Sequence, residues 1–279
     1  MTDQNTICSV TKGDAMAGQP TALGPGPRSR VRRRPQRARY DRDALHAILD
    51  EGLVAHLAFR TGSQPWVVPT VYARVDDRLY LHGSPAARWL RGRRPRPVCL
   101  AVTLVDGLVI ARSAFHHSLN YRSAVVFGGA RPVTDAGEKA LALEAILEHA
   151  VPGRSREARP PDERELRSTA VAVLPIEEAS AKVRTGDPVD DEADLSLPVW
   201  AGVLPLAWGV GVPVPAADLH GDLPAPPSVT GYVRPTSKAP GASSSPPEGE
   251  PGLAEDPCAS ASSATPTTTS GTWGGSSSS

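Results

Sequence analysis

The chain has 279 residues and carries 30 Lys and Arg against 30 Asp and Glu, which leaves a formal net charge of +0. This balance gives no global electrostatic reason to bind nucleic acid or an anionic membrane. The cysteines Cys8, Cys99 and Cys258 lack metal-type spacing, and no apolar run reaches the roughly 18 residues of a membrane span. We therefore expect a soluble protein of the reducing cytoplasm, with no bound metal and no membrane contact.

Both ends of the chain are poor in side chains that could form a core. Residues 1–35 lack apolar periodicity, and the stretch from residue 243 onward is largely Ser, Thr, Pro and Gly. Such segments cannot offset the entropy lost on ordering. We expect a disordered leader at residues 1–35, one folded domain at residues 36–215 and a disordered tail at residues 216–279.

A basic run of seven arginines lies between Arg28 and Arg39. It is the one local argument for binding nucleic acid. Because no aromatic residue or recognition helix is interleaved with it, we favour a solvated segment and expect no nucleic-acid partner.

The folded part begins with a predicted amphipathic helix at residues 41–51, where Leu and Ile recur at helical spacing and Asp41 or Asp43 can cap the first turn. Apolar and β-branched residues, separated by turn residues, then predict three strands at residues 53–60, 65–75 and 78–82. Pro69 stands inside the second strand and cannot donate to the ladder. It marks either an ordinary edge strand or a backbone freed to contact a flat ring.

The third strand runs through His82 and Gly83 into a predicted short helix. Ser84 would cap this helix and Pro85 would be its first residue, which leaves free N–H groups at a positive dipole end. Arg88, one turn on, adds a full positive charge. The segment is therefore a candidate anion site, and its alternative interpretation is a surface cap with an exposed arginine.

The densest polar segment follows the next strand. Residues 98–105 form an apolar run that stops at Asp106-Gly107, and residues 108–111 form a second run, which together predict a β-hairpin. Residues 115–123 are then a polar and aromatic loop before a strand at residues 124–127, an arrangement in which strands could hold a site. Further on, we predict helices at residues 134–150 and near residues 161–167, and a last barrel strand at residues 169–176.

The order Asp106-Gly107-Leu108-Val109, Ala111-Arg112-Ser113, Phe115-His116-His117-Ser118 and Asn120-Tyr121-Arg122-Ser123 resembles the pyridoxamine 5′-phosphate oxidase-like flavin-binding proteins, in particular their nitroimidazole-reductase-like branch. The resemblance extends over about residues 40–215. It implies a mainly β fold with flanking helices, a six-stranded antiparallel Greek-key split β-barrel, a homodimer, and FMN bound at the dimer interface.

The resemblance also implies a set of FMN-contacting residues. The second strand would line the flavin, the segment around Ser84 would hold its phosphate, and the polar segment would meet the flavin edge or the substrate. These cofactor-binding residues are Pro69, Thr70, Val71, Tyr72, His82, Gly83, Ser84, Arg88, Asn120, Tyr121 and Arg122. The second strand lacks the basic phosphate ligands of the pyridoxamine phosphate oxidases proper, which argues against phosphate-ester substrates and full oxidase activity.

We therefore expect an FMN-dependent oxidoreductase that acts on a small-molecule substrate, and the residues identify no catalytic group. Alternatives are a non-catalytic flavin-binding or haem-binding protein and an F420-dependent reductase on the same fold. His116 and His117 are poor metal ligands, because adjacent residues of an extended segment point in opposite directions. No nucleophile elbow, Walker loop or dinucleotide-binding glycine motif is present, which weakens hydrolase, kinase and Rossmann interpretations.

Overall fold

The computed structural model describes residues 22–90 and 94–234. Six antiparallel strands close a ring in the order β6, β7, β4, β3, β2, β5 and back to β6. Their bounds are β2 Val54–Thr61, β3 Gln64–Val75, β4 Arg78–Gly83, β5 Arg96–Ile110, β6 Ser118–Pro132 and β7 Ala170–Pro175. The ring confirms the predicted mainly β fold and its split β-barrel, and closure leaves these six strands without a free edge.

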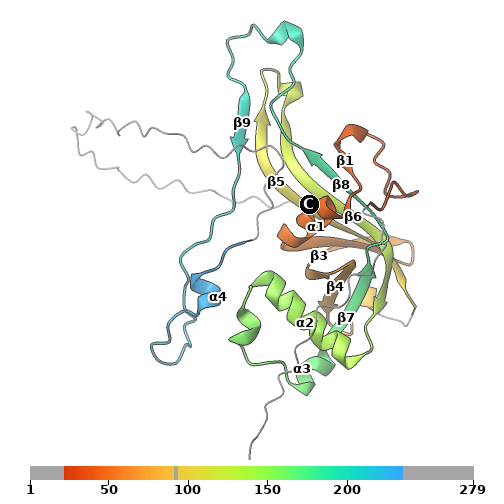
Figure 1. Ribbon diagram of the computed structural model, residues 1–279, viewed down its shortest axis with the longest axis vertical. Helices are drawn as coiled ribbons and strands as arrows, with labels where there is room; N and C mark the ends of the chain where they lie inside the picture. Colours follow the sequence, from red (N-terminus) through yellow and green to blue (C-terminus); the bar gives the residue numbers. More distant parts are fainter. Residues whose placement is uncertain (1–21, 91–93, 235–279) are drawn as a thin grey trace, which may run out of the picture. The chain divides into compact units, whose positions relative to one another are not determined.

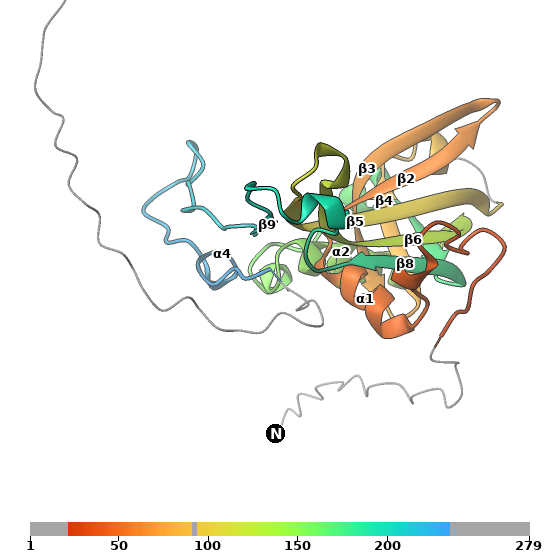
Figure 2. The same cartoon turned by 90° about the horizontal axis from the view of Figure 1, so that it is seen from above.

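Three further strands extend the sheet beyond the ring (Figures 1 and 2). β8 (Glu178–Arg184) runs along β6, and β1 (Ala38–Arg39) pairs with β8. β9 (Gly202–Pro205) pairs with the second half of β5. No helix among the described residues is long and apolar enough to cross a membrane.

The barrel core is built by alternation along each strand. In β2 the buried residues Ala55, Leu57 and Phe59 alternate with residues that point outward. Helix α1 (Arg42–Glu51) adds a buried leucine and isoleucine face to this core, and Trp89 from the short 3-10 helix η2 (Arg88–Leu90) joins it.

Helix α1 begins and ends as the sequence predicts. The Asp41 side chain accepts a hydrogen bond of 2.8 Å from the N–H of Ala44, which caps the first turn. At the other end a Cβ on Gly52 would collide with the side chain of Val102 and lie 2.9 Å from the Tyr72 hydroxyl. Only glycine therefore allows the chain to pass this close to the barrel.

A second, smaller core lies under helix α2 (Ala136–Ala150), which packs on β3, β4 and β7 (Figure 1). Ala142 and Ile146 meet Tyr80 and Val173 there. Helix α3 (Glu163–Ser168) starts with a capping box formed by Asp162 and Glu165. The remaining helical segments are η1 Pro35–Arg37, η3 Ala114–His116, η4 Arg154–Arg156, η5 Glu192–Asp194 and α4 Pro227–Thr230.

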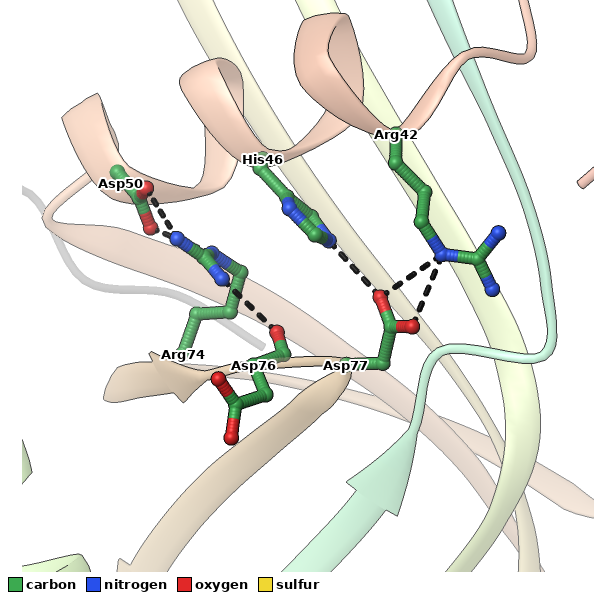
Figure 3. A network of polar contacts seen from close by, with 6 residues as sticks. All are labelled: Arg42, His46, Asp50, Arg74, Asp76 and Asp77. Atoms are coloured by element: carbon green, nitrogen blue, oxygen red, sulfur yellow. Dashed lines mark hydrogen bonds and ion pairs between the residues drawn. The ribbon is translucent and has the colours of Figure 1, made fainter. Parts of the chain in front are cut away.

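Polar side chains fasten α1 to the turn between β3 and β4 (Figure 3). Arg42 Nε lies 3.1 and 2.9 Å from the two carboxylate oxygens of Asp77, and His46 Nε2 lies 3.0 Å from one of them. One turn further along α1, Asp50 accepts hydrogen bonds of 2.7 and 2.6 Å from Arg74. Residues spaced by four share one helix face, so this face holds the hairpin in place.

The structure corrects the predicted hairpin at Asp106-Gly107. β5 continues through this position, and its register against β6 shifts between Val105 and Gly107. The pair therefore forms a bulge, and the chain turns only after Ile110. β6 starts at Ser118, so Asn120 belongs to a strand and not to a polar loop.

Part of the expected leader makes specific contacts, which corrects the prediction of disorder for residues 22–35. Leu23 pairs with Tyr40 through the backbone, and the N–H groups of Arg28 and Ser29 donate to the Glu178 carboxylate. Ser29 is 2% exposed. Glu178 lies 150 positions away from Arg28 in the sequence, so local composition could not reveal this anchor. Residues 1–21 lie outside the described residues.

The start of the expected tail is also anchored, which corrects the prediction for residues 227–234. The Ser228 hydroxyl donates to the Glu157 carboxylate, and the Tyr232 hydroxyl donates to the Ala150 carbonyl at 3.1 Å. Arg234 donates to the carbonyl oxygens of Glu51 and His149. A cation at the C-terminal ends of α1 and α2 is electrostatically favourable. Residues 235–279 lie outside the described residues.

His149 makes the fold sensitive to acid. Its Nε2 lies 2.7 Å from the Gly52 carbonyl oxygen and 3.4 Å from Arg234, and burial lowers the pKa of His149, with Arg234 lowering it further. A depressed histidine pKa means that the fold favours the neutral ring. Its contribution to stability is therefore complete above the unfolded pKa of about 6.5 and is lost as the pH falls from there through the lower folded pKa.

We expect His149→Gln to lose less of its free energy of unfolding than wild type when the pH falls from about 7.5 to about 5.5, measured by urea unfolding. Burial lowers the pKa of His82 as well, so part of the acid sensitivity remains. His220→Gln, at an exposed position, controls for removal of an imidazole. Equal acid losses in wild type and His149→Gln would contradict a neutral buried ring.

Candidate flavin site

The outward side of β2, β3 and β5 presents an apolar face. Antiparallel partners share a face, so the residues that alternate with the buried positions of β2 can be followed across all three strands. We call this face the outer patch; it consists of Val54, His56, Ala58, Val67, Pro69, Cys99, Ala101, Thr103 and Val105. Val67 is 63% exposed. Contiguous exposed apolar surface marks a place where a ligand or another protein binds.

A cleft of about 270 Å³ opens at one end of the outer patch. Among the described residues its lining is predominantly apolar, and Arg60 carries the one charge. The lining residues are Ala58, Phe59, Arg60, Pro65, Trp66, Val67, Pro97, Val98 and Cys99. Burial raises the pKa of the Cys99 thiol, which keeps this thiol protonated and unreactive. The cleft can therefore accept a flat apolar group with an anionic edge.

The turn after β4 differs from the prediction. Ser84 Oγ accepts a hydrogen bond of 3.2 Å from the N–H of Ala86, but no α-helix begins at Pro85. The 3-10 helix η2 follows, which is too short to provide a helix dipole. The expected anion site therefore loses its dipole and keeps the Arg88 charge.

Arg88 is exposed and its guanidinium lies 4.7 Å above the centre of the Trp66 ring. Trp66 also lines the cleft. Stacking on an aromatic face holds an arginine in place while its donors remain available. The cation is thus held beside the cleft.

His82 lies on β4 immediately before this turn and pairs with Val171 of β7. Its Nδ1 is buried and has no hydrogen-bond partner in the described part of the chain. Burial lowers the pKa of His82, so the ring is neutral at physiological pH. Gly83 ends the strand, and a Cβ there would lie 3.2 Å from Leu90.

The model of the family described as pyridoxamine 5′-phosphate oxidase matches residues 41–183. The chain belongs to the pyridoxamine 5′-phosphate oxidase-like family. Among solved structures, the flavocytochrome Anf3 from Azotobacter vinelandii is 40% identical, with a TM-score of 0.71, and the match covers 77% of this chain and 99% of Anf3.

The FAD and haem binding protein from Mycobacterium smegmatis is 35% identical, with a TM-score of 0.66. That match covers 70% of this chain and 96% of the mycobacterial protein. A comparison with curated proteins gave no match. Both solved relatives carry flavin binding in their names, and both matches extend well beyond residues 41–183.

The predicted flavin-lining strand β3 divides between the two faces of the sheet. Pro69 belongs to the outer patch, whereas Tyr72 is completely buried and its hydroxyl donates to the Leu49 carbonyl at 2.5 Å. Burial raises the pKa of the Tyr72 hydroxyl. The Thr70 hydroxyl donates a hydrogen bond to the Val71 carbonyl, and the Val71 side chain packs against the core under α2.

The polar side chains of the segment at residues 120–122 make contacts within the protein. Arg122 is 7% exposed and forks between two carboxylates, with hydrogen bonds of 2.9 and 2.6 Å to Asp106 and further bonds to Glu51. These two side chains hold the pKa of Arg122 above its ordinary value. The amide oxygen of buried Asn120 accepts from Arg184, and Tyr121 is half-buried opposite Arg184.

Each of the two histidines in the turn before β6 has one hydrogen-bond partner. His116 Nε2 lies 3.3 Å from Asp191, and His117 Nδ1 lies 3.0 Å from the Ser113 carbonyl. Within the described ranges, no group of three metal-ligating side chains occurs. Sequence reasoning did not select His56, Arg60 or Trp66; the alternation of β2, which it used for the core, also places His56 and Arg60 together on the outward face.

Proposed function

We propose that the chain is a homodimeric redox protein that binds a flavin as its main cofactor and a haem as its second. The observation that carries the proposal is the 40% identity to a flavocytochrome over 99% of the flavocytochrome's length. The second relative is named for FAD and haem. A bound flavin supplies the electron-transfer chemistry. The protein binds and orients the flavin and controls which molecules reach it.

The described residues suit a phosphorylated flavin. Arg88, stacked on Trp66 beside the cleft, offers a guanidinium fork to a phosphate. Phe59 and Val98 line the cleft from the same face as Trp66 and offer apolar contact to a ring. FMN, our first expectation, and FAD share both features, so the same residues serve either molecule.

Exposed apolar side chains support a homodimer. Val54, Val67 and Val105 of the outer patch are 44%, 63% and 38% exposed, and Trp200 and Trp208, which flank β9, are 66% and 94% exposed. A single chain leaves these side chains in water, and a second copy would cover them. The proposal also places the protein in the cytoplasm, where the free Cys99 thiol stays reduced.

The test is an absorption spectrum of the purified full chain, followed by mass spectrometry of the molecules released on denaturation and by light scattering. We expect a flavin spectrum, release of FMN or FAD, a haem Soret band and the mass of a dimer. Turnover of an added electron donor and a small-molecule acceptor would distinguish an oxidoreductase from a non-catalytic binder. A colourless protein that takes up neither flavin nor haem would overturn the proposal, and release of F420 would favour the deazaflavin alternative.

A further inference from the structure

The histidines of the described chain fall into two groups. His46, His116, His117 and His149 each have a hydrogen-bond partner in the protein. His56, His82 and His220 have no such partner within the described ranges. This second group contains the rings whose nitrogens remain available to a ligand.

His56 stands out in this group because of what surrounds it. It is exposed at the centre of the outer patch, opposite Pro69 of β3 and Ala101 of β5. Neither neighbour has a polar side chain. An imidazole covered by an apolar partner would be left without a hydrogen bond, which is costly, whereas a metal ion on that nitrogen would satisfy it.

The cleft lies next to this ring. Ala58 follows His56 by two positions on the same face of β2, and it lines the cleft together with Val67 and Cys99. Arg60 follows two positions further on, at the rim, about 13 Å from His56 at roughly 3.3 Å per residue. The face therefore combines a free imidazole, a flat apolar surface and a cation in one line.

A haem requires this combination of groups. Its iron is held in many proteins by a neutral histidine nitrogen, its macrocycle is flat and apolar, and its two carboxylates favour a cation. His82 fits less well, because its Nδ1 is buried and its β7 neighbour Val171 packs in the core under α2.

We propose that His56 is an axial ligand of a haem whose macrocycle lies on the outer patch and whose carboxylates meet Arg60. The proposal rests on the proposed function for the presence of a haem, and it assigns the ligand and the surface. It predicts that the haem depends on β2 and not on the turn after β4.

The test uses the full chain, titrated with hemin and followed by its Soret absorption. Wild type should bind hemin with the spectrum of a histidine-ligated haem, and His56→Ala should bind it at least roughly tenfold more weakly, with a changed spectrum. His220→Ala removes another exposed imidazole and is the matched control, which should retain the wild-type spectrum. His82→Ala tests the alternative ligand. In His56→Gly, added imidazole should restore the spectrum, a rescue that a merely structural role would not produce.

Flavin content of each variant, measured on the same samples, reports whether the fold and the flavin site survive. The proposal is overturned if His56→Ala binds hemin as wild type does, or if the loss occurs in His82→Ala instead; haem binding would then stand with a different ligand. It is also overturned if wild type binds flavin but no hemin, in which case only the flavin part of the proposed function remains.

Discussion

Arg122→Ala should lower the free energy of unfolding by about 3–5 kcal/mol, because it leaves two carboxylates without their shared cation. The side chains of Arg122, Glu51 and Asp106 are 8%, 12% and 24% exposed. Glu51 ends α1 and Asp106 forms the bulge of β5, so one guanidinium joins three elements. Removing it leaves negative charge where water has little access to screen it.

Urea unfolding, monitored by circular dichroism, measures this loss. Arg74→Ala is the matched control: it also removes a forked ion pair, but its partner Asp50 is 42% exposed, and exposed pairs contribute roughly 1 kcal/mol or less. Equal losses in the two variants would show that burial does not determine the effect. A stable Arg122→Ala that loses flavin would instead support our first expectation, that Arg122 contacts the cofactor.

The barrel could be predicted from the sequence because its signals are local. Alternation in β2 and the cap at Asp41 each depend on residues within one strand or one turn, and both are present in the structure. The long helix α2 shows the same agreement: it spans Ala136–Ala150, within the predicted residues 134–150, and buries Ala142 and Ile146 on one face. Such features do not depend on contacts with residues that are distant in the sequence.

The errors concern side chains whose partners are distant in sequence. Asp106-Gly107 has the composition of a hairpin turn, but Arg122 takes the Asp106 carboxylate and β9 runs beside Gly107, where a Cβ would lie 3.0 Å from the Leu204 carbonyl oxygen. Residues 22–35 and 227–234 have the composition of disorder, yet Glu178 and the ends of α1 and α2 hold them. Local propensity cannot include these contacts.

The candidate site shows the same division. Arg88 was chosen for its spacing from Ser84, and the structure places it beside the cleft, although through Trp66 and not through a helix terminus. His56 was not selected from the sequence. Its neighbours Pro69 and Ala101 come from two other strands, so its apolar surroundings emerge only from strand pairing.

Arg88→Ala should weaken binding of the flavin phosphate more than any neutral change at the turn. Loss of one partner from a largely desolvated, charge-assisted contact costs on the order of 2–5 kcal/mol, which corresponds to roughly 30-fold or more in affinity. The fold should persist, because Arg88 is exposed on a 3-10 helix. Arg88→Lys should fall between wild type and alanine, since it keeps the charge and loses both the fork and the stacking on Trp66.

Titration of the apoprotein with FMN, FAD and riboflavin, followed by fluorescence quenching, separates the phosphate from the ring. Riboflavin lacks the phosphate, so wild type and Arg88→Ala should bind it about equally, while FMN and FAD should both distinguish them. Arg94→Ala is the matched control, because Arg94 is exposed close by in the sequence but is not placed on Trp66. If riboflavin loses as much affinity as FMN, Arg88 acts on the ring or on the fold. If Arg94→Ala alone weakens FMN binding, Arg94 and not Arg88 holds the phosphate.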